Sequence, residues 1–283
     1  MADLLVTLPH HAAALPLEIQ AEMLGPRFGD DRARADLLER VRREGDPSTD
    51  LLFRLPGARF VSATVSRFVV DLNRAPDDRD ANGVVKASDF SGRPLYPPGG
   101  APDEEAVRAR LRRYHAPFHA QVEHEIARRR PWLIVDGHSM TAAGPSLGPD
   151  RGRPRPAASL ITGGGPDGEP IDRPVSLPPE LARRLASALD AALAARLPLG
   201  SDGLPSGVRI NDPFAHGYVQ ERYGADPDGP RVPTVSIELH RGLFEDAEAR
   251  PRSDRVVLLR AAVLEAIDAL RPGLAPGDRK SVV

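Results

Sequence analysis

Five residues carry the side chains that a metal-assisted hydrolysis needs, three in or just after apolar runs and two in a polar turn. His10 follows the run "LLVTLP", His138 follows "WLIVD", and Glu238 lies within "TVSIELH". Asp46 and Asp50 share the polar turn "EGDPSTD". A catalytic zinc ion takes three ligands from residues of these types and leaves one position for water, whose pKa falls toward about 7. A separate carboxylate can pass that water's proton to a leaving amine.

These residue types alone do not decide the function. Eight histidines and forty acidic residues allow many such combinations. The stretch "VDGHSM", Val135–Met140, is also ordinary turn composition, although strand ends are where α/β sheets bind ligands. Asp136 either ends the strand or orients His138, as an outer carboxylate does for a metal ligand. Ser139 lacks an evident base and a GxSxG context, which argues against a serine nucleophile.

The composition excludes several classes of protein. The chain of 283 residues is 41% apolar and 28% charged, as in an ordinary globular protein. A net charge of −2 without a long basic block gives no sign of a nucleic-acid or membrane partner. The absence of cysteine leaves His, Asp and Glu as the metal ligands. No stretch resembles a signal peptide or a membrane helix, so we expect a cytoplasmic protein.

Strands and helices are predicted to alternate along the chain. Strands are expected at 4–9, 132–139, 207–212 and 234–240, with two strand segments within 58–74. Helices are expected at 18–43, interrupted at Gly25 and Pro26, at 103–130, bent near Pro117, at 178–197 and at 253–270. A long Gly- and Pro-rich loop is expected over 142–177. This order favours a single α/β domain over 1–283, with a largely parallel or mixed sheet covered on both faces.

Several short motifs, in order, resemble the N-formylglutamate amidohydrolase (N-formylglutamate deformylase) family. They span roughly 4–244 and read "LPHH", "EGDPSTDLLF", "SRFVVDLNR", "PLYPPG", "YHAPFH", "VDGHSM", "NDPFAHGYVQERYG" and "SIELHRGLF". "VVDLNR", "VDGHS" and "NDPF-x-x-GY" are the more specific of them. The resemblance implies a three-layer αβα sandwich with a mixed, mostly parallel sheet, similar to zinc carboxypeptidases. It also implies a zinc-dependent amidohydrolase that contains one divalent ion.

The resemblance assigns roles to individual residues. It implies His10, His138 and Asp46 as the metal ligands, with Asp50 the alternative acid, and Glu238 as the general acid/base. The residues expected to bind a small acidic N-acyl amino acid are Arg67, Asn73 and Arg74. Arginine suits this task because its planar guanidinium pairs with carboxylates through two hydrogen bonds. Asn211 and Tyr218 of "NDPFAHGY" are further candidates.

The chain departs from the family pattern at three places. "PHHA" offers His11 beside His10, and "AHGY" has His216 where glycine is common. The segment 144–174 is richer in Gly and Pro than its family counterpart. These departures affect the expected substrate more than the expected chemistry, so a peptide or another specialised amide is an alternative substrate. A non-catalytic binding protein that retains the fold is the second alternative.

His115 and His119 are four residues apart on a predicted helix, which resembles a metal-binding pair. The glutamate of an HExxH motif is missing and Pro117 interrupts the pair. We therefore interpret His119 as a residue that could support the site from outside the metal ligands.

Overall fold

The computed structural model describes residues 3–201, 203–226 and 231–274. A six-stranded sheet runs through its centre, with the strand order β2-β1-β3-β6-β4-β5. The strands are β1 (Leu4–Leu8), β2 (Arg59–Ser62), β3 (Leu133–Met140), β4 (Ala158–Ile161), β5 (Val208–Ile210) and β6 (Thr234–His240). Every neighbouring pair is parallel except β4 with β6. The expected mixed, mostly parallel sheet is confirmed.

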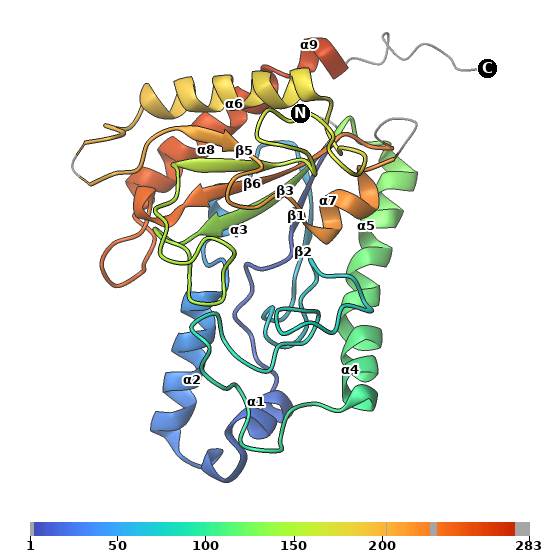
Figure 1. The fold of residues 1–283 in the computed structure, drawn as a ribbon, viewed down its shortest axis with the longest axis vertical. Coiled ribbons are helices and arrows are strands. Elements are labelled where there is room, and N and C mark those ends of the chain that lie inside the picture. The colour runs from blue at the N-terminus through green and yellow to red at the C-terminus, as the bar shows by residue number, and fades with distance from the viewer. Residues whose placement is uncertain (1–2, 202, 227–230, 275–283) are drawn as a thin grey trace.

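Helices cover both faces of the sheet, which gives three layers (Figure 1). The helices are α1 (Leu17–Leu24), α2 (Asp31–Glu44), α3 (Thr49–Leu52), α4 (Glu104–Arg110), α5 (Ala116–Arg129), α6 (Pro179–Ala194), α7 (Tyr218–Tyr223), α8 (Ser253–Asp268) and α9 (Arg271–Leu274). Short 3-10 turns lie at Gly25–Arg27 and Arg241–Leu243, and a π-helical turn at Leu111–His115 joins α4 to α5. None of the helices in these described ranges is long and apolar enough to cross a membrane.

The side chains of β1 point alternately into two separate hydrophobic cores, one on each face of the sheet. Leu4, Val6 and Leu8 belong to the core that includes α6 and α8, which lie side by side in Figure 1. Leu5 belongs to the opposite core, which includes Ile134 of β3 and residues of α1, α2 and α5. Successive side chains of a strand point to opposite faces, so both faces of this sheet are apolar and must be covered.

Close packing explains why the residue between Asp136 and His138, Gly137, is a glycine. A Cβ atom at Gly137 would lie 2.6 Å from the Phe53 ring and 2.9 Å from Leu8 Cδ2. The α3 segment therefore packs directly on the backbone of β3, one residue before His138. Close packing, rather than a turn, requires glycine here, because β3 continues through Met140.

Two sequence-based expectations are wrong. The segment 58–74 contains one strand, β2, rather than two, because residues 65–74 form turns and isolated bends. Its apolar residues Phe68, Val69 and Val70 are fully buried without pairing as a strand. The long loop expected over 142–177 contains β4, a completely buried strand. A four-residue strand between Pro- and Gly-rich flanks gives too short a pattern to recognise.

Candidate functional site

His10, Asp46 and His138 form a buried cluster at the carboxyl ends of β1 and β3. Their ligand atoms all lie within 4.8 Å of one another. His138 Nδ1 lies 3.2 Å from His10 Nδ1 and 3.0 Å from Asp46 Oδ2, and His10 Nδ1 lies 3.5 Å from the same oxygen. A hydrogen bond from Asp46 N to His10 O, 3.0 Å long, fixes the loop that carries the carboxylate beside the first histidine.

The other nitrogen of each histidine faces a second carboxylate. His10 Nε2 lies 2.7 Å from Asp71 Oδ1, and His138 Nε2 lies 2.7 Å from Asp136 Oδ2. Each Nε2–H can donate to its carboxylate, which leaves Nδ1 as a lone pair directed at the cluster. Carboxylates that accept from ligating histidines fix the tautomer and raise the basicity of the ligand.

Asp136 belongs to a polar row that crosses three strands. Strand register places Thr7 of β1 and Ser236 of β6 on either side of it. Thr7 Oγ1 donates to Asp136 Oδ1 at 2.6 Å, and Ser236 Oγ donates to Oδ2 at 3.0 Å. Both hydroxyls are fully buried, so they hold the carboxylate in one orientation beneath His138.

Asp71 is compensated by two cations. Its carboxylate is fully buried and accepts from Lys86 Nζ at 2.6 Å and from Arg67 Nη2 at 2.8 Å. Burial alone would raise the pKa of Asp71, but Arg67 and Lys86 outweigh burial and hold that pKa well below its usual range. The ionised carboxylate that His10 requires is therefore stable inside the protein.

The cluster fits a divalent metal ion. Three carboxylates, Asp46, Asp71 and Asp136, surround two imidazoles in a buried space. Burial would lower the pKa of His138, yet Asp136 and Asp46 raise that pKa well above its usual value. The same negative charge favours a divalent cation, and two nitrogens with one carboxylate oxygen are the donors of a catalytic zinc site.

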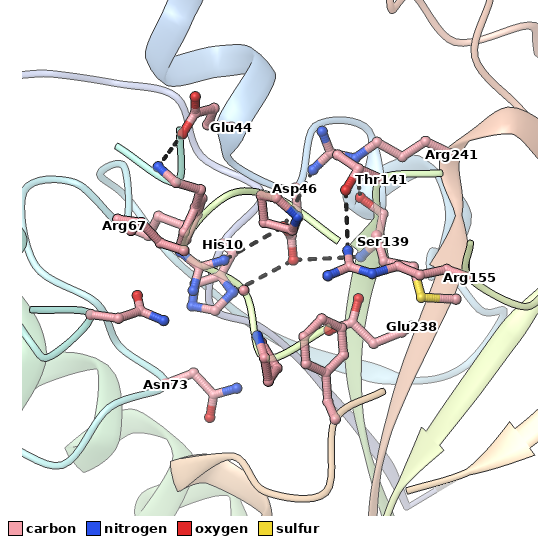
Figure 2. Close-up of a pocket in the computed structure, with 18 of the residues that line it drawn as sticks. His10, Glu44, Asp46, Arg67, Asn73, Ser139, Thr141, Arg155, Glu238 and Arg241 are labelled. Carbon is pink, nitrogen blue, oxygen red and sulfur yellow. Dashed lines mark hydrogen bonds and ion pairs between the residues drawn. The ribbon is translucent and has the colours of Figure 1, made fainter. Parts of the chain in front are cut away.

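Glu238 lies beside the cluster and has a free oxygen. Strand register pairs it with His138, and its side chain lines the same cavity (Figure 2). Its Oε2 atom is buried without a hydrogen-bond partner. Burial raises the pKa of Glu238 to about 7, against the opposing effect of His138. A carboxylate with this pKa and an unused oxygen can both accept and release a proton near neutral pH.

The cavity next to the cluster measures about 240 Å³. His10, Asp46 and Glu238 line it together with Asn73, as Figure 2 shows. The rest of its wall combines further polar side chains, four arginines among them, with the apolar residues Phe90, Met140, Pro145, Leu147, Pro149, Ile161 and Phe214. A cleft in which apolar walls and convergent polar groups meet is typical of a small-molecule site.

Four arginines line the cavity, and three of them already have carboxylate partners. Arg67 pairs with Asp71. Arg155 donates to Asp150 from Nε at 2.8 Å and from Nη2 at 2.9 Å. Arg241 lies 3.6 Å from Asp46 and donates to backbone carbonyls, including that of Gly45.

Arg74 differs from the other three. Its Nε atom donates to Asn82 O at 3.0 Å, and it forms no ion pair with a described carboxylate. Its other two guanidinium nitrogens are therefore available to an anionic ligand.

Asn73 contacts the site through its side chain. Its Nδ2 atom lies 3.3 Å from His138 Nε2 and 3.5 Å from Asp136 Oδ2. Its Oδ1 atom accepts from Val219 N at 2.8 Å. The amide therefore links the first turn of α7 to the outer carboxylate of the cluster.

The structure places several other candidate residues outside the cluster. Asp50, the alternative acidic ligand, lies on α3, where it is partly exposed and 4.0 Å from Arg54. His11 contacts only Leu8 O among its polar partners in the described ranges, at 3.2 Å. Asn211, directly after β5, bonds to Thr162 and Gly165 in the loop that follows β4, and it supports that loop rather than the cavity.

Two further candidates, His216 and Tyr218, also lie outside the cluster. His216 lines the cavity, but its side chain is exposed and lies 3.4 Å from Glu221. Tyr218 packs against His119, with ring centroids 5.1 Å apart, and does not line the cavity.

Sequence reasoning missed Asp71, Lys86, Thr7 and Ser236. Asp71 stands inside the quoted motif "VVDLNR", so its acidic type between apolar residues was the available signal. Lys86 has no comparable signal, because its partner lies fifteen residues away and only the fold brings the two together. Thr7 and Ser236 are single polar residues in apolar strands, and such residues are common.

Comparison with known proteins identifies relatives along most of the chain. A family model described as N-formylglutamate amidohydrolase matches residues 2–245. An N-formylglutamate deformylase of Pseudomonas aeruginosa is 29% identical over 279 residues, which are 94% of this chain and 92% of the relative. One from Pseudomonas putida is 34% identical over 154 residues, or 50% of this chain and 57% of the relative.

A solved structure has the same fold. The crystal structure of N-formylglutamate amidohydrolase from Ralstonia eutropha JMP134 at 2.00 Å superposes with a TM-score of 0.70. The alignment covers 96% of this chain and 95% of that one at 20% identity. At 20% identity this likeness establishes the fold of the chain but not the chemistry of its site.

The geometry predicts that Asp46, rather than Asp50, is the acidic ligand of a bound metal ion. Asp46→Ala should weaken Zn²⁺ binding by more than the roughly 10–100-fold that losing an outer carboxylate costs, because it removes a ligand oxygen. Asp50→Ala is the matched control and should bind Zn²⁺ as the parent does. Competition with a chromogenic chelator measures both. Equal loss in the two variants, or loss only in Asp50→Ala, would contradict the assignment.

Proposed function

Because the chain belongs to the N-formylglutamate amidohydrolase family, we propose that it hydrolyses the amide of an N-formyl or other N-acyl amino acid. The observation that carries this proposal is the free carboxylate of Glu238 beside the His10–Asp46–His138 cluster, in one cavity with an uncompensated arginine. For N-formylglutamate the products are formate and glutamate. The apolar wall of the cavity also suits an acyl group larger than formyl.

We propose one divalent ion, Zn²⁺, held by His10 Nδ1, His138 Nδ1 and an oxygen of Asp46. When bound, such an ion supplies Lewis-acid chemistry that activates water and polarises the acyl carbonyl. Asp71 and Asp136 keep the two imidazoles in the tautomer that this role requires.

Glu238 transfers the proton of the reaction. It takes a proton from the water whose oxygen attacks the acyl carbon, and it delivers that proton to the amide nitrogen as the C–N bond breaks. Its raised pKa suits both halves of this transfer. The products are a carboxylic acid and an amino acid with a free amine.

The substrate carboxylate binds at Arg74. This guanidinium has two free nitrogens, whereas Arg67 is occupied by Asp71 and lies 3.8 Å from Asp46. We therefore assign Arg74 to substrate recognition, with Asn73 beside it. Arg67 helps to form this side of the cavity and compensates the buried carboxylates, a role for which its bidentate fork is suited.

Glu238→Gln should separate catalysis from binding. The variant keeps the size of the side chain but cannot accept a proton, so turnover should fall by about 10²–10⁴ while metal content stays at the parent value. Glu245→Gln is the control, because Glu245 is also partly buried with an unpaired oxygen but does not line the cavity. Turnover and metal content are measured on one preparation. Loss of metal from Glu238→Gln would make Glu238 a ligand instead, and unchanged turnover would exclude it from catalysis.

Arg74→Ala should raise KM for an acidic N-acyl amino acid by about 10- to 150-fold, the worth of a charge-assisted pair. Its kcat should change much less, because the cluster and Glu238 remain. Arg79→Ala is the control, since Arg79 is exposed and pairs with Glu104. Steady-state kinetics on N-formylglutamate measure both variants. A KM that is unchanged in Arg74→Ala would move carboxylate recognition to another cation.

A further inference from the structure

Two buried histidines hold the backbone on which Arg74 stands. His119 Nε2 lies 3.0 Å from Leu72 O, and His115 Nε2 lies 2.9 Å from Arg74 O. The two carbonyls belong to alternate residues of one short turn. The two ring nitrogens therefore contact the turn on either side of Asn73.

The same turn is bonded from α7. Tyr218 N donates to Asn73 O at 3.4 Å, and Val219 N donates to Asn73 Oδ1 at 2.8 Å. Three successive carbonyls, those of residues 72, 73 and 74, thus accept hydrogen bonds from outside the turn. Residues 72–74 have no regular secondary structure, and these hydrogen bonds fix the backbone of each of the three.

A π-helical turn precedes the second histidine. His115 is the last residue of the π-helical turn Leu111–His115, and His119 lies in the first turns of α5. Their ring centroids are 4.4 Å apart, so the two imidazoles lie together against residues 72–74. Such turns occur frequently at functional positions in helices.

The hydrogen bonds determine the state of both rings. A carbonyl can only accept, so Nε2 carries the proton in each histidine. His119 Nδ1 lies 2.7 Å from the Tyr223 hydroxyl and can accept from it. Burial lowers the pKa of His119 to about 3, with His115 acting in the same direction, and burial also lowers the pKa of His115. Both rings are therefore neutral donors, and their Nε2 atoms are not free to bind a metal.

We infer that His115 and His119 are positioning residues that fix the backbone of residues 72–74 and thereby aim Arg74 at the substrate carboxylate. The inference rests on the proposed function, in which Arg74 binds that carboxylate. It assigns to the "YHAPFH" motif a role in substrate affinity, distinct from the metal-binding pair that its spacing resembles.

The test compares His115→Leu with His115→Gln. A glutamine side chain can place an amide N–H near the position of Nε2, whereas leucine cannot donate. His115→Leu should raise KM for N-formylglutamate by about 5- to 100-fold, because the Arg74 carbonyl loses its buried partner. In this variant kcat should stay within about 2-fold of the parent and Zn²⁺ affinity should not change, while His115→Gln should restore most of the lost affinity.

Equal KM values in the parent and a folded His115→Leu, or a glutamine variant no better than leucine, would overturn the inference. Circular dichroism shows whether His115→Leu folds. If it does not, the inference is tested on the parent protein instead. Histidine-selective ¹⁵N NMR should then find both rings neutral with the proton on Nε2, and the Nδ1–H tautomer or a charged ring would overturn the inference. A parent that hydrolyses no N-acyl amino acid removes the proposed function, whereas the NMR result still tests how the turn is held.

Discussion

The site depends on the orientation of two histidines. In each, Nε2 contacts a buried carboxylate and Nδ1 faces the same point beside Asp46. Asp71 fixes His10 and Asp136 fixes His138, both at 2.7 Å. With both rings fixed, Nδ1 of each is confined near Asp46. A catalytic constellation needs this degree of pre-organisation, because ligands that are free to rotate would lose affinity and geometry together.

Holding carboxylates in a dry interior requires compensating charge. An unpaired buried charge costs several kcal/mol, so the two outer carboxylates, Asp71 and Asp136, are each matched by donors or cations. Lys86 and Arg67 compensate Asp71, whereas the hydroxyls of Thr7 and Ser236 suffice for Asp136 beside His138. The site thus recruits residues from β1, β3, β6 and the 65–86 segment. The parallel sheet brings these together because the strand ends that supply them lie at one edge.

Sequence reasoning identified the residues with distinctive types at strand ends, and it missed those whose partners are distant in the chain. His10, His138 and Glu238 follow or occupy strongly apolar strands, so their polarity was visible. The family resemblance favoured Asp46 over Asp50, but both lie in one turn, and only the folded turn separates them by placing Asp46 beside the histidines and Asp50 beside Arg54. The layers followed from alternating strands and helices, but β4 and the coil over 65–74 depended on tertiary packing that local patterns do not contain.

The proposed metal site binds one ion through Nδ1 of both histidines. Crystals grown with Zn²⁺ and measured on both sides of the zinc absorption edge test this coordination. We expect one strong anomalous peak per chain, about 2.0–2.2 Å from His10 Nδ1, His138 Nδ1 and an oxygen of Asp46, with Glu238 outside that distance. A peak bound through Nε2, a peak at His115 and His119, or no peak at the cluster would contradict it.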